Sequence, residues 1–331
     1  MNYKKLIEKA GQNHVHINEP MQAHTSFQVG GPADVFIEPD NEALFADLVT
    51  ICKDEKIPFY ILGNGSNLLV KDGGFRGAVI CTKGLKGIAT DDTLLVAHAG
   101  DTLKEVAQAA QEAGLTGLEF ASGIPGTLGG GIRMNAGAYD GEMKDVVESA
   151  TVLDEDGRIV EIPAEELHFS YRHSLLQERP LWLVCAKIRL KQGDKAAIQA
   201  KMDDLNGRRA DKQPLEYPSA GSTFRRPEGY FAGKLIQDSG FQGVKVGGAQ
   251  VSEKHAGFVI NAGGATAADI LSLIHQIQEK IREQFGVDIH REVIVIGEDP
   301  DGAQSPNEGT AAETDKPLQT DRNNRTEQDP E

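Results

Sequence analysis

Residues 122–139 most narrowly constrain what this chain can fold into, and they read Ser-Gly-Ile-Pro-Gly-Thr-Leu-Gly-Gly-Gly-Ile-Arg-Met-Asn-Ala-Gly-Ala-Tyr. Six of the eighteen are glycine and one is proline, which is not the composition of an ordinary helix or strand. Glycine lacks a Cβ, so its backbone can approach a ligand closely and can take a positive φ. Another glycine-rich loop, residues 63–70, follows a strand-like run at 57–62; it is called the first glycine loop, and residues 122–130 are called the second. Two such loops predict a large ligand that carries several phosphates.

The first of these loops does not match the common nucleotide-binding fingerprints. It has glycine at 63 and 65 but leucine at 68, and no helical pattern follows, so we reject the Gly-x-Gly-x-x-Gly dinucleotide fold. A Gly-x4-Gly-Lys-Ser/Thr phosphate loop is not found either. Each glycine loop alone could consist of tight structural turns. Together, and with the polar side chains of Asn64, Ser66 and Asn67, they predict an unusual phosphate cradle.

Charge and composition narrow the class of protein. A chain of 331 residues with 39% hydrophobic residues predicts a soluble globular protein of about two domains. The net charge of −16 argues against nucleic acid as a partner. Ten acidic and three basic residues between 298 and 331 supply −7 of that charge, and we expect residues 299–331 to form a disordered acidic tail.

Cysteine spacing and hydropathy indicate the compartment. Cys52, Cys81 and Cys185 are odd in number and widely separated, a pattern that favours reduced thiols over a disulfide framework or a metal site. No run approaches the ~18 apolar residues of a membrane span, and the first residues lack the pattern of a secretory signal. We therefore expect a cytoplasmic protein with no metal and no membrane insertion.

Periodicity predicts an α+β fold with two unequal domains. Residues 1–195 are expected to form a cofactor domain of two lobes, residues 196–298 a smaller domain, and a change in composition near 191 marks the boundary. The expected helices cover residues 41–52, 103–113, 196–210 and 266–285. The expected strands cover residues 33–38, 58–62, 77–81, 93–99, 181–190, 255–261 and 293–297, with a hairpin over 149–162.

Three polar residues stand out, although the pattern leaves the role of each open. Arg172 lies beside tyrosine, histidine and serine, a setting suited to an anionic substrate, although most arginines form surface ion pairs. Ser222 lies between two prolines and could be a nucleophile, a proton donor or a turn residue, but the Gly-x-Ser-x-Gly motif of hydrolases is missing. Glu292 begins a buried strand, where a carboxylate is either capped or held in a cleft with a shifted pKa.

Taken in chain order, these segments resemble the UDP-N-acetylenolpyruvoylglucosamine reductase family, flavoenzymes of peptidoglycan precursor synthesis. The resemblance extends over residues ~20 to 298, as judged from the order of its motifs. Those motifs are residues 25–33 (Thr-Ser-Phe-Gln-Val-Gly-Gly-Pro-Ala), 62–69, 122–130, 134–139, 171–174 (Tyr-Arg-x-Ser), 212–214 (Lys-Gln-Pro), 218–224 (Pro-Ser-Ala-Gly-Ser-Thr-Phe), 233–236 and 291–292.

The resemblance implies a cofactor and a fold for each domain. Residues 1–195 would be a two-lobed FAD-binding domain of the vanillyl-alcohol-oxidase (PCMH) type, and residues 196–298 a smaller α/β substrate-binding domain. No histidine or cysteine is placed for a covalent link, so we expect dissociable FAD. The residues expected to hold it are Gly63, Asn64, Gly65, Ser66, Asn67, Ser122, Gly123, Ile124, Pro125, Gly126 and Gly130.

The resemblance also implies a reaction. NADPH would reduce the flavin, and flavin N5 would pass hydride to the methylene carbon of UDP-N-acetylglucosamine enolpyruvate. Arg172 and Glu292 would polarise the substrate carboxylate and stabilise the enolate-like intermediate, and Ser222 would give the proton that completes UDP-N-acetylmuramate. The expected substrate contacts are Asn135, Tyr171, Lys212 and Gln213.

Some features depart from the family pattern and keep alternatives open. Gly131 and Arg133 stand where apolar or small residues are expected, and no tyrosine-bearing insertion is present, which is typical of the shorter subclass. We expect a monomer or a weak homo-oligomer. The alternatives are an FAD-dependent oxidase of the same fold that acts on another small alcohol, and a cofactor-retaining protein whose tail docks a partner.

Overall fold

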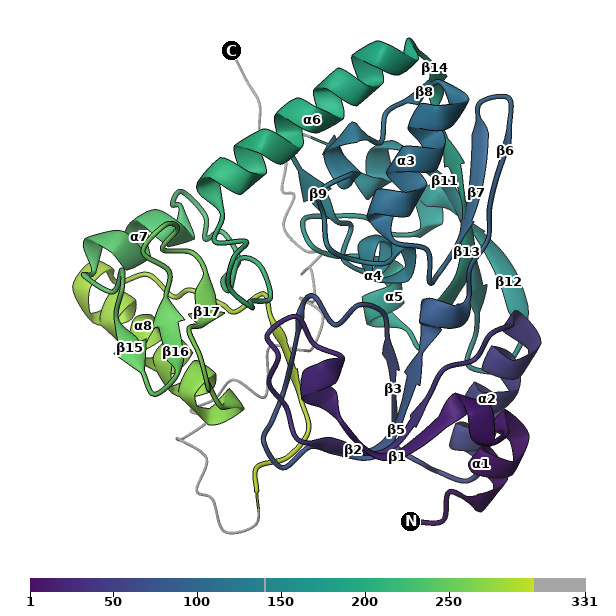
Figure 1. The fold of residues 1–331 in the computed structure, drawn as a ribbon, viewed down its shortest axis with the longest axis horizontal. Helices are drawn as coiled ribbons and strands as arrows, with labels where there is room; N and C mark the ends of the chain where they lie inside the picture. The colour runs from purple at the N-terminus through teal and green to yellow at the C-terminus, as the bar shows by residue number, and fades with distance from the viewer. Residues whose placement is uncertain (140, 301–331) are drawn as a thin grey trace, which may run out of the picture.

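The structure is a computed structural model that describes residues 1–139 and 141–300. Two lobes lie side by side at one end of the molecule, and a third, smaller part lies at the other end of the long helix α6 (Figure 1). Most of the tail expected to be disordered, residues 301–331, lies outside the described residues. None of the helices in the described ranges combines the length and apolar character that a membrane crossing requires.

The first lobe is built on a four-stranded sheet with the order β1-β2-β5-β3. Strands β2, β5 and β3 run parallel, whereas β1 pairs antiparallel with β2. Helices α1 and α2 pack together on one face, where Leu6, Phe45 and Leu48 are fully buried. The elements are α1 (Lys4–Ala10), β1 (Val15–Pro20), β2 (Pro32–Ile37), α2 (Glu42–Asp54), β3 (Phe59–Leu62) and β5 (Phe75–Cys81).

The second lobe is a five-stranded antiparallel sheet, β12-β11-β13-β7-β6, and the hairpin expected over 149–162 forms its edge. Helix α3 begins at a capping box between Thr102 and Glu105 and ends at Gly114, which has φ +73°. The elements are β6 (Ile88–Asp91), β7 (Leu94–His98), α3 (Leu103–Ala113), α4 (Leu128–Arg133), β11 (Val147–Leu153), β12 (Ile159–Pro163), α5 (Leu175–Glu178) and β13 (Trp182–Arg189). The second lobe also contains two short antiparallel strand pairs. In one, β8 (Leu115–Thr116) pairs with β14 (Lys191–Gln192); in the other, β9 (Gly137–Ala138) pairs with β10 (Gly141–Glu142).

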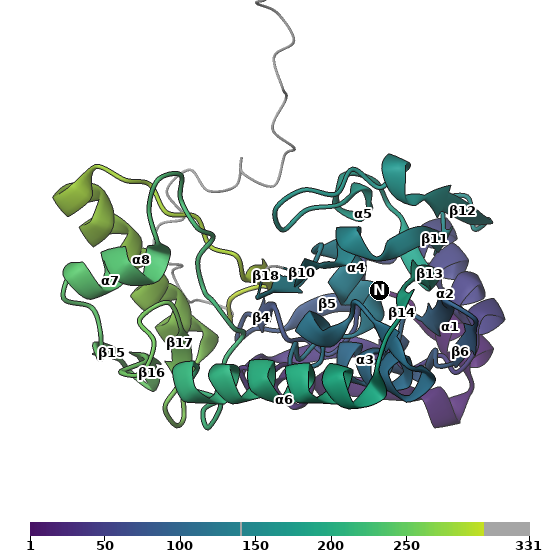
Figure 2. The same ribbon diagram turned by 90° about the horizontal axis from the view of Figure 1, so that it is seen from above.

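Helix α6 (Lys195–Lys212) connects the lobes to the third part (Figures 1 and 2). Its side chains Ile198 and Met202 are buried in the apolar core of the second lobe. Lys201 also pairs at 3.6 Å with Glu119, a carboxylate that is only 3% exposed in that lobe. The core of the second lobe therefore extends past residue 196, into the helix.

The third part is a small three-stranded sheet packed against α8. The buried residues of α8, among them Ile270, Leu273 and Ile277, recur at helical spacing. The strand expected over 255–261 forms only from Val259, because the Ser252 hydroxyl accepts the N–H groups of Lys254 and His255 and turns the chain. The elements are α7 (Ala232–Asp238), β15 (Lys245–Val246), β16 (Ala249–Val251), β17 (Val259–Asn261) and α8 (Ala267–Phe285).

The chain finally returns to the first lobe. Strand β18 (Ile294–Ile296) pairs parallel with β4 (Leu68–Val70), the strand that follows the first glycine loop. The Asn67 side chain donates to the carbonyl of Glu292 at 3.2 Å, and Asn67 accepts from the N–H of Ile294 at 3.1 Å. This pairing brings Glu292 to the first glycine loop, although 225 residues separate them from each other.

Candidate active site

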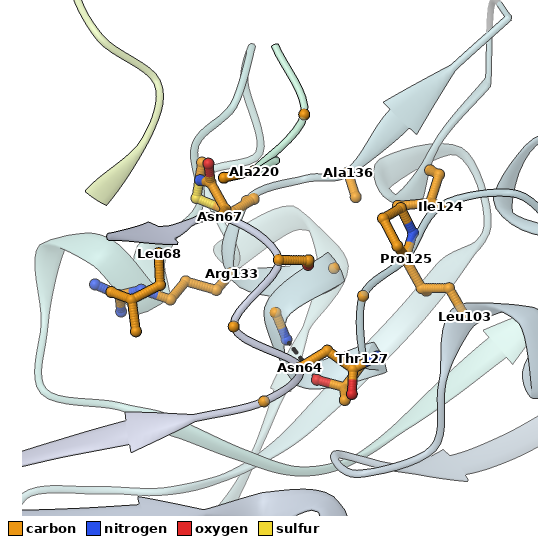
Figure 3. Close-up of a pocket in the computed structure, with 18 of the residues that line it drawn as sticks. Asn64, Asn67, Leu68, Leu103, Ile124, Pro125, Thr127, Arg133, Ala136 and Ala220 are labelled. Atoms are coloured by element: carbon orange, nitrogen blue, oxygen red, sulfur yellow. Dashed lines mark hydrogen bonds between the residues drawn. The ribbon is translucent and has the colours of Figure 1, made fainter. Parts of the chain in front are cut away.

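A cavity of about 610 Å³ lies where the three parts of the molecule meet. Both glycine loops line it, as Figure 3 shows with Asn64, Asn67, Ile124, Pro125 and Thr127. The C-terminal end of α6 and residues 220–222 line it as well. A neighbouring cavity of about 430 Å³ faces the third part. Four residues line both cavities: Arg172, Ser222, His255 and Glu292. The three residues predicted to be catalytic therefore lie together where the two cavities meet.

The first glycine loop has the geometry of an anion cradle. Gly65 has φ +61°, and a Cβ at this position would overlap the carbonyl oxygen of His24. A Cβ at Gly63 would overlap the hydroxyl of Thr127 in the second loop. The main-chain N–H groups of residues 64–67 donate no hydrogen bond within the described part of the chain. Consecutive free N–H groups on a cavity wall favour a negatively charged ligand.

The second glycine loop leads into α4, whose N-cap is Thr127. The three consecutive glycines of this helix differ in their surroundings. A Cβ at Gly131 would press on Leu103 at 3.1 Å, and one at Gly129 would lie 3.3 Å from the carbonyl oxygen of Ala99. At Gly130, which is exposed, a Cβ would meet nothing closer than 3.8 Å. Gly130 therefore presents bare backbone to the open cavity.

Most of the predicted cofactor-binding residues line this cavity, but two of them do not. Residues 63–67, 124–126 and Gly130 all contribute to its wall. The buried Ser122 instead donates its hydroxyl hydrogen to the carbonyl of Glu119 at 2.9 Å. A Cβ at Gly123 would overlap the side-chain oxygen of Asn206, so this glycine permits the close approach of α6. The structure thus places Ser122 and Gly123 behind the cavity wall, against α6.

Arg172 and Glu292 form an ion pair at the junction of the cavities. The Arg172 Nε lies 2.8 Å from Glu292 Oε1, and the Arg172 Nη2 donates to the carbonyl of Gly137 at 3.3 Å. Burial raises the pKa of Glu292, and the attraction of Arg172 offsets this only in part. The Glu292 carboxyl therefore holds a proton more readily than an exposed carboxyl does.

Ser222 is held beside this ion pair through its neighbour in the sequence. The N–H of Glu292 donates to the carbonyl of Thr223 at 2.8 Å, which joins the two segments. The hydroxyl of Thr223, fully buried, accepts from the N–H of Val259 at 2.9 Å. Ser222 is exposed to the cavity, and its hydroxyl makes no hydrogen bond with any described residue. That hydroxyl is therefore free to act on a ligand.

The four predicted substrate contacts lie in different surroundings. Lys212 and Gln213 line the larger cavity, and the Gln213 Oε1 is buried there without a hydrogen-bond partner among the described residues. Tyr171 lines the smaller cavity. Asn135 lines neither cavity and is only 1% exposed. Its side-chain nitrogen donates to the Glu142 carboxylate and to the carbonyl of Ser170, and its side-chain oxygen accepts from the N–H of Lys144. These contacts brace the turn after α4, and a role for Asn135 in substrate binding stays a prediction.

Two functional candidates were missed by the sequence reasoning. Arg209 lines the larger cavity, has no ion pair in the described ranges, and has a pKa that burial lowers. Its position three residues before Lys212 on one helix face was the signal that could have found it. His255 lines both cavities, and its Nδ1 accepts from the N–H of Gly257 at 3.1 Å. No pattern in the sequence marks His255, because only folding brings it to the junction.

Comparison with known proteins agrees with this geometry. Residues 33–163 match the family model described as FAD binding domain. Residues 213–296 match the model described as UDP-N-acetylenolpyruvoylglucosamine reductase, C-terminal domain. The α+β fold class and an FAD-binding domain, both predicted from the sequence, are confirmed.

Full-length relatives carry the same name. The UDP-N-acetylenolpyruvoylglucosamine reductase of Clostridium perfringens is 51% identical over 297 residues, which cover 90% of this chain and 98% of the relative. That of Caldanaerobacter subterraneus is 51% identical over 294 residues, or 89% and 97% of the two chains. The crystal structure of the Thermus caldophilus reductase superposes with a TM-score of 0.72 at 33% identity and covers 86% of this chain and 98% of that one. The chain therefore belongs to the UDP-N-acetylenolpyruvoylglucosamine reductase family.

Proposed function

We propose that this protein uses NADPH and FAD to reduce UDP-N-acetylglucosamine enolpyruvate to UDP-N-acetylmuramate. The observation that carries the proposal is the junction of the two cavities, where Arg172, Ser222 and Glu292 lie together. One cavity is walled by glycine loops and the other by cationic side chains, which suits a cofactor on one side and a nucleotide-linked substrate on the other.

The larger cavity fits FAD. The free N–H groups of residues 64–67 suit its diphosphate, and the exposed Gly130 leaves room beside them for a flat ring system. The residues proposed to hold FAD are residues 63–67, 124–126 and Gly130, without a covalent link. When bound, FAD would supply the transfer of hydride from NADPH to the enolpyruvyl methylene carbon.

Arg172 and Glu292 are proposed to act on the substrate carboxylate. A guanidinium can bind a carboxylate with two parallel hydrogen bonds. In this structure the Arg172 Nε lies 2.8 Å from Glu292 Oε1, so the guanidinium already faces one carboxyl group. Burial raises the pKa of Glu292, so this carboxyl binds a proton more readily than an exposed one does. In its protonated form it would donate a hydrogen bond to the enolate oxygen as negative charge develops there. The free hydroxyl of Ser222 then donates the proton to the carbon next to the carboxylate, which completes the lactyl ether.

The smaller cavity is proposed to hold the uridine diphosphate. Arg226 lies 4.0 Å above the ring of Phe231 and donates to the carbonyl of Tyr230 at 3.3 Å. Lys234 and Lys254 line the same cavity. Clustered cations and an exposed ring suit a diphosphate and a base. In this proposal the sugar spans the junction, so the enolpyruvyl group reaches Arg172.

An anaerobic stopped-flow experiment tests the proposed function. NADPH should bleach the oxidised flavin band, and the enolpyruvyl substrate should restore it rapidly. The Ser222→Ala variant should still bleach with NADPH but recover its colour at least about a hundredfold more slowly, the usual scale of a lost proton donor. A flavin that reoxidises only when oxygen is admitted, with release of peroxide, would support the oxidase alternative instead. A protein without flavin would refute the assignment of both glycine loops.

The proposed substrate is a soluble precursor, which favours a cytoplasmic location for the reaction. A monomer or weak homo-oligomer stays a prediction. The docking alternative predicts that the protein's role tolerates the loss of Arg172, Ser222 and Glu292 together, whereas a reductase should lose turnover and keep its flavin colour. A triple variant therefore distinguishes the two.

A further inference from the structure

The hairpin that carries Arg172 is held in an unfavourable backbone conformation. His168 has φ +48° and Arg172 has φ +56°, a region that residues other than glycine rarely occupy. Two reciprocal bonds close the hairpin: the N–H of Ser170 donates to the carbonyl of His173 at 3.2 Å, and the N–H of His173 donates back at 3.1 Å. Because such a conformation persists only when its surroundings enforce it, contacts from outside the hairpin must hold it.

Helix α5 supplies those contacts. The Glu178 carboxylate lies 3.0 Å from Nδ1 of His168 and 2.8 Å from Nε2 of His173, so it contacts both ends of the hairpin. The hydrogen bond from His173 is the main reason that the pKa of Glu178 is lowered. The preceding Gln177 donates to the carbonyl of Arg172 at 3.0 Å. Three contacts from one short helix therefore fix the segment around Arg172.

We propose that Glu178 is a positioning residue for Arg172. Glu178 lines neither cavity, so it does not touch the ligands, whereas both of its histidine partners flank Arg172 in the hairpin. Without the carboxylate the hairpin can relax toward negative φ, and the guanidinium then leaves the place from which it contacts Glu292 and the carbonyl of Gly137. This inference rests on the proposed function, in which Arg172 binds the substrate carboxylate.

A double-mutant cycle tests it in the FAD-loaded enzyme. The measured rate is the anaerobic reoxidation of the reduced flavin by the enolpyruvyl substrate. Glu178→Ala should slow this rate by about 10- to 100-fold, the scale expected when a catalytic group is misplaced by roughly 1 Å. In an Arg172→Ala background the same substitution should change the rate less than about twofold, because its effect passes through Arg172. Glu178→Gln, which keeps one acceptor oxygen, should recover part of the rate.

The matched control is Glu279→Ala on α8, which removes a similar pair, His275 Nε2 to Glu279 Oε1 at 3.2 Å, away from both cavities. It should leave reoxidation unchanged. If Glu178→Ala fails to fold, His173→Asn removes one contact of the same carboxylate and should slow reoxidation by a smaller factor.

The outcomes separate this inference from the proposed function. Equal slowing by Glu178→Ala with and without Arg172 overturns the positioning role, because the effects would then be independent. Unchanged reoxidation in Glu178→Ala, with slow reoxidation in Arg172→Ala, overturns the positioning role alone. Unchanged reoxidation in Arg172→Ala overturns the proposed role of Arg172 and this inference with it.

Discussion

Replacing Gly130 by alanine should separate the stability of the protein from its affinity for FAD. Gly130 lies inside α4, where alanine is favoured over glycine by about 0.5–1 kcal/mol. The new methyl group would meet no protein atom closer than 3.8 Å, so nothing offsets this gain. In protein stripped of flavin, Gly130→Ala should therefore raise the free energy of unfolding by about 0.5–1 kcal/mol.

The same methyl group would project into the space proposed for FAD. Forcing a methyl into a filled space costs about 1–3 kcal/mol, which weakens binding about 5- to 150-fold at 1.4 kcal/mol per factor of ten. Urea denaturation of the flavin-free protein measures the change in the free energy of unfolding. Quenching of flavin fluorescence during titration measures the change in affinity for FAD.

Gly131→Ala is the matched control, one residue along the same helix. Its Cβ would press on Leu103 at 3.1 Å, so the flavin-free protein should lose stability. The reasoning would be refuted if Gly130→Ala bound FAD as tightly as the unaltered protein, because Gly130 would then not adjoin the cofactor. A loss of stability in Gly130→Ala would refute the helical part of the argument.

Three further predictions concern other parts of the fold. Gly65→Ala should lower the free energy of unfolding by about 2–4 kcal/mol in urea denaturation, since it combines a left-handed φ with overlap on the His24 carbonyl; an unchanged midpoint would contradict it. Burial raises the pKa of Glu292 in the folded protein above its value in the unfolded chain. Ionised Glu292 therefore destabilises the fold at pH values above its folded pKa, and this destabilisation is gone once the pH is below the unfolded pKa. Glu292→Gln should therefore be more stable than the unaltered protein at pH 8, with a smaller difference at pH 4, and denaturation at the two pH values checks the sign. Glu119→Ala should cost about 2–4 kcal/mol in thermal denaturation, because it leaves Thr116, the N–H of Gly117 and Lys201 without their carboxylate.

Local patterns predicted the four longest of the described helices, α2, α3, α6 and α8, but none of the short helices α1, α4, α5 and α7. The helix expected over 103–113 forms with those bounds, because the capping residues Thr102 and Glu105 and the terminal Gly114 act within one turn of each end. The strand expected over 255–261 begins late because local groups compete for the N–H groups of its first residues. The Ser252 hydroxyl accepts from His255, and the ring and carbonyl of His255 accept from Gly257 and Phe258. Propensity alone does not reveal such a bond.

The sequence indicated which residues line the cavity where residue chemistry was local, but not where it depended on packing. The glycines of both loops were recognisable because bare backbone is needed at a ligand wherever it lies in the fold. Ser122 and Gly123 belong to the same glycine-rich segment, yet they face Glu119 and Asn206 behind the cavity wall. A sequence motif does not show which of its residues face the cavity, so Ser122 and Gly123 could not be distinguished from their neighbours.

By itself, the sequence determined the fold class and marked the two glycine loops, because these follow from composition and short-range spacing. The roles proposed for Arg172, Ser222 and Glu292 came from the family resemblance and stay predictions. Only the tertiary structure decided which side chains meet. The parallel pairing of β18 with β4 brings Glu292 to Asn67, and the bond from Glu292 to the carbonyl of Thr223 places Ser222 beside it. Arg209 and His255 reach the cavities in the same way. The physical reason is that backbone pairing between distant segments depends on the packing of whole lobes, which no local window of residues contains.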